Sequence, residues 1–350
     1  SAGDCDGRVG QPRPVIDQGQ SAAAATPTVG LLLDCVSHVI VRNIEIRQVN
    51  DAGITTSLDG CVTTDLRVES SHVHHVYGSD LVAGIRLANT SGARVRANLL
   101  HDIVREAGAS TPVVVTAGAT QDVLVQSNSI SRAHSGVALR SAGHAVADVA
   151  ITQNRLTDLE TAVHAQADAG SAGSVSDVAI SDNTIAGVAS AVTAEFDRSS
   201  QQSSGLVFHN NTVVDTSDAA LIVSGVDGLA SYNNIFANTA SDVLVTEVPR
   251  DPARVNSIDY IDNNLIWSEA GPYWTLSLGG LAAQRFVGLD TWRSAWSGVS
   301  HDDLIADPDV SSLFADPQFT NAAGGDYRTE NPALIGAGRD GADIGARTDQ

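Results

Sequence analysis

A pattern that repeats down the chain constrains this fold more than any other feature of the sequence. When RVRANLLHDI, VLVQSNSISR, VAITQNRLTD, VAISDNTIAG, LVFHNNTVVD, GLASYNNIFA and DYIDNNLIWS are aligned, one asparagine of each falls in a single column. The column holds Asn98, Asn128, Asn154, Asn183, Asn211, Asn234 and Asn264, and Ser71 of VRVESSHVHH joins it. A repeat of 23 to 30 residues built of strand-like segments is typical of a solenoid, whose coils bury their apolar faces by stacking. The sequence predicts an all-β fold, a single-stranded right-handed parallel β-helix.

The asparagine column has a physical reason in such a fold. Strands of successive coils stack roughly 4.8 Å apart. An inward Asn at a tight bend then bonds the Asn above and below, so that amides in a dry interior are paired. The sequence therefore predicts an Asn ladder.

A second regularity lies in the strand that opens each coil after Gly, Ala or Asp, as in GIRLA, GVALR and DVLVT. Alternate residues of a strand point to opposite faces, which predicts one inward pair per coil. The predicted inward pairs are Ile54/Thr56, Ile85/Leu87, Val113/Val115, Val137/Leu139, Val163/Ala165, Val192/Ala194, Leu221/Val223 and Val243/Val245. All but Thr56 are apolar, which supports the predicted register.

From these repeats the chain resembles the pectate-lyase-like superfamily of secreted β-helix proteins, over about residues 29 to 345. The tail GGDYRTENPALIGAGRDGADIGA resembles the segment that closes many bacterial carbohydrate-active β-helix proteins. It departs from that pattern at Asn331 and Gly336, where Ser and Asp are usual. The resemblance implies a secreted protein, extracellular or periplasmic, with a polysaccharide as its partner.

The chain divides into three parts on this interpretation. Residues 1–28 form an irregular lead-in or cap and residues 29–267 the coils. Residues 268–350 hold a short helix and loops, suggested by LDTWRSAWSGVSHDDLIADP, and the closing segment. The first residues, SAGDCDGRVGQPRPVID, lack the pattern of a signal peptide, and we interpret them as a mature amino terminus or an artificial start of the chain.

Composition excludes several classes of function. The net charge of −21 disfavours nucleic acid and anionic lipid as partners, and no apolar run is long enough for a membrane span. All 20 basic residues are Arg, which excludes a lysine base and a P-loop. The oligomeric state stays open.

The cysteines allow one pairing. Cys35 and Cys61 fall at nearly the same place in the first two coils, so their Cα atoms should lie about 5 Å apart. Either a disulfide or a stacked pair of buried thiols fits this placement, and Cys5 is left over.

The outward positions of the opening strands are where we expect the catalytic and substrate-binding residues. One outward column reads Thr55, Arg86, Val114, Ala138, His164, Thr193, Ile222 and Leu244, and the next reads Ser57, Ala88, Thr116, Arg140, Gln166, Glu195, Ser224 and Thr246. In the resembling enzymes this sheet is the floor of the polysaccharide groove. We predict His164, Arg140, Glu195 and Arg86 as catalytic residues, and Gln166, Asp197, Arg198, His134 and Glu160 as substrate-binding residues. The alternative is that they are ordinary solvated residues.

Two further groups suggest metal sites. His72 and His74 of HVHH flank inward Val73 and face outward, and His74 falls in one column with His101. Imidazoles at that spacing suit zinc or copper, but no third ligand is evident, so we predict no metal there. Asp307, Asp309 and Asp316 leave calcium open, although the repeated Asp-Pro is typical of turns. No cofactor is predicted.

Three functions remain. The first is a polysaccharide lyase, in which Arg86 or Arg140 neutralises a uronate carboxylate and His164 or Arg140 takes the C5 proton. The second is a glycoside hydrolase that uses Glu195 with Asp197 or Glu160 as the second carboxylate. The third is a non-catalytic glycan-binding or structural β-helix, because Tyr77 and Phe196 are the only aromatic residues among the first two hundred. The enzyme interpretation rests mainly on fold resemblance.

Overall fold

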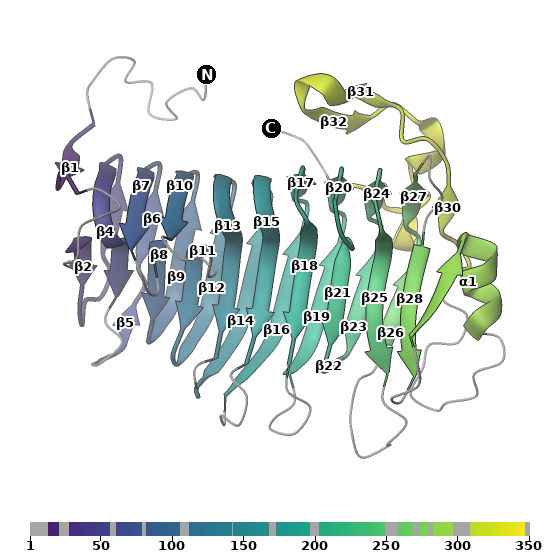
Figure 1. Ribbon diagram of the computed structural model, residues 1–350. Helices are drawn as coiled ribbons and strands as arrows, with labels where there is room; N and C mark the ends of the chain where they lie inside the picture. Colours follow the sequence, from purple (N-terminus) through teal and green to yellow (C-terminus); the bar gives the residue numbers. More distant parts are fainter. Residues whose placement is uncertain are drawn as a thin grey trace.

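The strands of the computed structural model stack into an elongated parallel β-helix (Figure 1). The structure describes residues 13–20, 28–56, 61–78, 82–105, 112–141, 143–167, 173–196, 203–248, 258–268, 273–278, 283–296 and 309–346. Each coil contributes strands to three faces, which we number in chain order. Within the described residues no helix is long and apolar enough to cross a membrane.

Face 1 is a sheet of parallel strands in which each strand pairs with its counterpart one coil away. Its strands are β3 (Ile40–Arg42), β6 (Arg67–Glu69), β9 (Thr90–Arg96), β12 (Thr120–Gln126), β14 (Ala145–Thr152), β16 (Ser174–Ser181), β19 (Ser203–His209), β23 (Leu229–Tyr232) and β26 (Ile258–Asp262), with the short β5 (Thr63–Thr64) and β22 (Val226–Asp227).

Face 2 follows face 1 around the first corner of the coil. It comprises β1 (Val15–Asp17), β7 (His72–Gly78), β10 (Leu99–Arg105), β17 (Thr184–Ala186), β20 (Thr212–Val214), β24 (Ile235–Ala237), β27 (Leu265–Trp267), β30 (Leu313–Phe314) and the first halves of β4 (Glu45–Thr56), β13 (Ser129–Arg140) and β15 (Arg155–Gln166).

Face 3 holds the strands whose outward residues were predicted to form the groove. It comprises β2 (Thr28–Leu33), β8 (Ala83–Ala88), β11 (Pro112–Ala117), β18 (Ser190–Glu195), β21 (Leu221–Ser224), β25 (Asp242–Val248), β28 (Tyr273–Leu278), the antiparallel β29 (Gln284–Val287) and the second halves of β4, β13 and β15.

The Asn ladder is confirmed. From Asn128 to Asn264, each ladder side chain accepts from the backbone N–H and the side-chain amide of the Asn one coil earlier, as Asn128 does from Asn98 at 3.0 Å in both contacts. Ser71 starts the ladder by donating its backbone N–H to Asn98, and Ser312 ends it by accepting from Asn264. Ser312 was not predicted as a member.

The corner before each ladder position from Ser71 to Asn264 has a left-handed backbone conformation at a residue other than glycine. These residues are Ser70, Ala97, Ser127, Gln153, Asp182, Asn210, Asn233 and Asn263, with φ between 49° and 57°. Asn and Asp tolerate this conformation better than other residues with a Cβ atom, and Asn or Asp occupies four of these eight corners.

The predicted inward register holds in six coils and is wrong in two. Val114 lies in register with Ile85 and Val137 and is fully buried, so it is the inward residue of its strand. Leu244 pairs with Leu221 and is buried, so Leu244 replaces the predicted pair Val243/Val245. Both strands contain consecutive apolar residues, and such runs carry no alternation from which to choose a register.

The cysteine alternatives are resolved in favour of the bridge. Cys35 and Cys61 form a disulfide with Cα atoms 5.2 Å apart, which joins the turns of the first two coils. Cys5 and Ser57 lie outside the described residues.

The C-terminal region covers one end and one flank of the solenoid. Helix α1 (Leu289–Trp296) confirms the predicted short helix, and its Trp292 stacks on Trp274 over the end of the core. Residues 313–346, which we call the strap, return along face 2 above β17, β20, β24 and β27 (Figure 1). The strap contains β31 (Phe319–Asn321), β32 (Asp326–Thr329) and short 3-10 helices at Ala322–Gly324, Pro332–Leu334 and Arg339–Gly341.

Candidate functional site

Face 3 brings four of the predicted residues into two neighbouring outward columns. His164 of β15 lies in register with Ala138 and Thr193. Arg140 pairs with Gln166, and Gln166 pairs with Glu195. His164 is therefore diagonally next to Arg140, while Glu195 lies two coils from Arg140, a backbone separation of about 10 Å.

The His164 ring is half-buried on this face. Burial lowers the pKa of His164, and the positive charges of Arg140 and His134 lower it further against the opposing effect of Glu160. Burial disfavours the imidazolium ion, so the ring is neutral at neutral pH. A neutral imidazole beside a guanidinium can accept a proton from a substrate whose anionic group the guanidinium holds.

His134 and Glu160 form a pair earlier on the same strands, at the corner between face 2 and face 3, where His134 Nδ1 lies 2.5 Å from Glu160 Oε2. Glu160 precedes His164 by four residues and Gln166, the register partner of Glu195, by six. The predicted residues thus follow the strands as a strip and do not converge on one point.

Arg86 does not join this strip. Its side chain is 10% exposed and forms an ion pair with Asp51 of the preceding coil. Arg86 pairs with Val115, which belongs to the coil before Ala138, so about 14 Å separates it from His164. Asp197 and Arg198 lie outside the described residues.

Sugar-binding sites often use an aromatic ring as a stacking platform, but three large aromatic residues of this chain are buried elsewhere. Phe196 is buried in the core, and Trp274 and Trp292 are buried at the end of the solenoid. The described part of this strip therefore receives no aromatic platform from these three residues.

The aspartates considered for calcium have protein partners. Asp309 is buried and accepts hydrogen bonds from Trp292 Nε1 at 2.7 Å and Ser312 Oγ at 2.6 Å. Asp316 accepts from the backbone N–H of Gln318, as expected for a turn. Asp307 lies outside the described residues.

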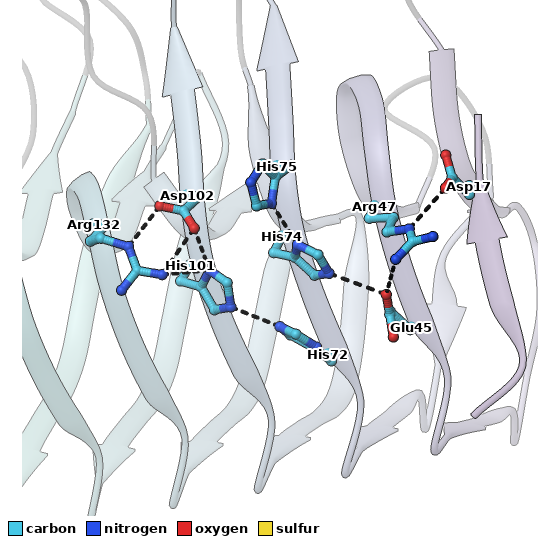
Figure 2. Close-up of polar contacts among 9 residues, drawn as sticks. All are labelled: Asp17, Glu45, Arg47, His72, His74, His75, His101, Asp102 and Arg132. Atoms are coloured by element: carbon cyan, nitrogen blue, oxygen red, sulfur yellow. Dashed lines mark hydrogen bonds and ion pairs between the residues drawn. The ribbon is translucent and has the colours of Figure 1, made fainter. Parts of the chain in front are cut away.

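Face 2 contains a second polar centre, the histidine cluster of His72, His74, His75 and His101 (Figure 2). His74 and His101 lie in register on β7 and β10, as the sequence predicted. His72 supplies the third ring, because its Nε2 reaches diagonally to within 2.7 Å of His101 Nε2. One ring nitrogen from each of His72, His74 and His101 lies within 4.8 Å of the other two.

Charged residues from neighbouring coils support this cluster. His101 Nδ1 lies 2.6 Å from Asp102 Oδ2, and Arg132 donates to the same carboxylate at 2.7 and 2.9 Å. The Arg132 hydrogen bonds hold the pKa of Asp102 well below its usual range. On the other side Glu45 Oε1 lies 3.4 Å from His74 Nε2 and accepts from Arg47 at 3.0 Å.

Comparison with known proteins gives likenesses of low identity. The exopolygalacturonase of Thermotoga maritima is 9% identical over 71% of this chain and 57% of its own, with a TM-score of 0.35. The mannuronan C-5 epimerase AlgE6 A-module of Azotobacter vinelandii is 11% identical over 81% and 65%, with a TM-score of 0.39. XylC, solved with xylose, is 15% identical over 81% and 39%, with a TM-score of 0.41.

This chain thus spans between 39% and 65% of the length of these three structures. A search of curated protein sequences found no match. The family model described as "Right handed beta helix region" matches residues 83–269, more than half of the chain, where the Asn ladder and the stacked strands lie. The chain belongs to the right-handed β-helix family.

Proposed function

We propose that this protein is a polysaccharide lyase that acts on a uronate-containing glycan bound along face 3. One observation carries the proposal: the half-buried, neutral imidazole of His164 lies diagonally beside the guanidinium of Arg140 on an outward face. β-Elimination needs a base for the C5 proton and a cation that stabilises the charge developing on the carboxylate.

In this mechanism Arg140 holds the uronate carboxylate and His164 removes the C5 proton. The electron pair released at C5 forms the C4–C5 double bond, and the glycosidic oxygen leaves from C4 and takes up a proton from water, so that the products are an unsaturated uronate and a free hydroxyl. Gln166 lies between Arg140 and Glu195 and supplies hydrogen-bonding groups to the sugar hydroxyls. The strip formed by His134, Glu160 and His164 runs along β13 and β15 and offers further contacts to the neighbouring sugars.

The hydrolase needs two carboxyl groups roughly 5 to 9.5 Å apart. Glu160 lies one coil from Glu195 and six residues before its register partner Gln166, so Glu160 and Glu195 are not neighbours on face 3. The other candidate, Asp197, lies outside the described residues, so the lyase rests on the His164–Arg140 pair.

The test is incubation with a panel of acidic and neutral polysaccharides, with product followed by the ultraviolet absorbance of an unsaturated uronate and by a reducing-sugar assay. We expect absorbance to rise on a uronate polymer and to disappear in His164→Ala. His209→Ala is the matched control, because His209 is a half-buried outward histidine on face 1. Reducing ends without absorbance, lost in Glu195→Gln, would establish the hydrolase instead. Silence across the panel would refute both enzymes and favour a binding or structural protein.

A further inference from the structure

The histidine cluster of face 2 places three imidazoles together by the geometry of the β-helix alone. His72 and His74 are two residues apart on β7, so both point outward while Val73 between them is fully buried. His101 stands beside His74 one coil later. The rings stack at centroid distances of 4.1 Å for His72 and His74, and 5.1 Å for His74 and His101.

The three rings meet the chemical requirement for metal ligands. Imidazole binds metal through the lone pair of a neutral ring nitrogen, and one ring nitrogen from each of His72, His74 and His101 lies within 4.8 Å of the other two. The Nε2 atoms of His72 and His101 lie 2.7 Å apart. One of the two nitrogens therefore carries a proton and donates it to the lone pair of the other. A metal ion that replaces this proton binds both lone pairs.

The surroundings resemble the outer contacts of bound metals. A metal-ligating histidine usually donates the N–H of its second ring nitrogen to a hydrogen-bond acceptor such as a carboxylate. This bond fixes the tautomer and orients the ring. Asp102 stands in that position against His101 Nδ1, and Arg132, whose Nη2 also lies 2.9 Å from this Nδ1, anchors the Asp102 carboxylate (Figure 2). In the tautomer that donates Nδ1–H to Asp102, His101 Nε2, the atom that faces His72, is the ligand atom.

The site is also accessible. The strap covers face 2 over β17 to β27, and its contacts reach back to Arg155 of β15, which lies two coils beyond the β10 strand of His101. The side chains of His74 and His101 are 12% and 14% exposed, so the rings are held by packing yet reach solvent.

We propose that His72, His74 and His101 form a binding site for a divalent transition-metal ion. The nitrogen ligands select zinc, copper or nickel over calcium and magnesium, which prefer oxygen. Three histidines leave a fourth coordination position for water or an incoming ligand on the outward side. Asp102 positions His101 through its Nδ1. The site lies on a different face from His164 and Arg140, the proposed base and its partner in the lyase, and is independent of that activity.

Isothermal titration of the metal-free protein with Zn²⁺ tests the site. We expect one ion per chain in the wild type and a loss of affinity of at least about 100-fold in His72→Gln and in His101→Gln. Asp102→Asn should weaken binding by about 10- to 100-fold, because the ring loses its orienting partner. His38→Gln, which changes a histidine outside the cluster, should bind as the wild type does.

Co²⁺ provides the second readout, because its visible bands report nitrogen ligands in a tetrahedral site. These bands should appear with the wild type and His38→Gln and be absent from His101→Gln, whose circular dichroism shows whether it is folded. Failure of the wild type to bind Zn²⁺, or equal binding by folded His72→Gln and His101→Gln, would overturn the proposal.

Discussion

The two halves of face 2 present opposite chemistry at equivalent positions. One outward column runs through Arg47, His74 and His101 in the first coils and through Ala186, Val214 and Ala237 in later coils. The early members are charged or titratable and lie open, whereas the later members are apolar and lie beneath the strap. The backbone is the same in both halves. The outward residues are therefore polar where solvent reaches them and apolar where another segment covers them.

The largest expected effect concerns the Asn ladder, which both halves share. Asn128→Ala and Asn211→Ala each remove the side-chain oxygen that accepts from the preceding ladder Asn and the side-chain amide that donates to a buried carbonyl and to the next ladder Asn. Each buried group left without a partner costs about 1 to 3 kcal/mol. We expect each substitution to lower the free energy of unfolding by about 4 kcal/mol in urea denaturation. A clearly smaller cost for Asn211 would show that the strap compensates for the ladder in the covered half.

A carboxylate placed in each half tests the comparison directly. Val214 is 1% exposed beneath the strap, whereas Thr157 occupies the same column two coils earlier and is half-buried. We expect Val214→Asp to cost about 3 kcal/mol or more, because it buries an unpaired polar group, and Thr157→Asp to cost less than about 0.5 kcal/mol. Hydrogen exchange of the strap amides should rise only in Val214→Asp; a rise in both variants would contradict the comparison.

Asp309 lies beside helix α1 at the covered end and should make the free energy of unfolding depend on pH. Burial raises the pKa of Asp309 to about 6, so the folded protein holds this proton when an unfolded chain, with a pKa of about 4, has lost it. The unfolding free energy should therefore fall as pH rises from about 4 to about 6, by up to about 3 kcal/mol. Urea midpoints across this range should show a smaller decline in Asp309→Asn than in the wild type. Parallel curves would contradict the assignment.

The smallest expected effect comes from glycine substitutions at the left-handed corners, which should stabilise the protein in the open half and destabilise it in the covered half. Ala97 occupies a left-handed corner in the open half, with φ of 52°, and Ala97→Gly should stabilise the protein by about 0.5 kcal/mol. Asn233 occupies the same corner beneath the strap and accepts a hydrogen bond from the backbone N–H of Arg339 at 2.7 Å. Asn233→Gly should therefore destabilise the protein by about 1 kcal/mol. Thermal unfolding of both variants measures the sign, and stabilisation by Asn233→Gly would show that the bond contributes little.

The fold was largely predictable because its determinants are local and repeated. The Asn column, the inward apolar pairs and the juxtaposition of Cys35 with Cys61 all follow from stacking one coil on the next. The predicted inward register was wrong at Val114 and Leu244, because these strands are apolar at successive positions. Ser312 was missed because it follows Asn264 by 48 residues, far outside the repeat.

The site was less predictable because it depends on side-chain reach. The outward placement of His72, His74 and His101 followed from alternation, but the diagonal contact of His72 with His101 did not. The Asp102–Arg132 support comes from two corners with φ near 55°, and alternation along a strand says nothing about corner residues. Arg86 was expected to face a groove, yet its partner Asp51 is 35 residues away in sequence.

The strap also has a consequence for the order in which the chain can fold as it is synthesised. Successive coils contact only their neighbours, so the early coils can stack as soon as each one is complete. Val214 and Ala237, in contrast, become covered only after Leu334 and Ile344, more than ninety residues further on, have been synthesised. During that interval a growing chain exposes an apolar ridge that its finished form conceals. A chain interrupted before the strap would therefore tend to associate through that ridge, whereas one shortened within the early coils would not carry it.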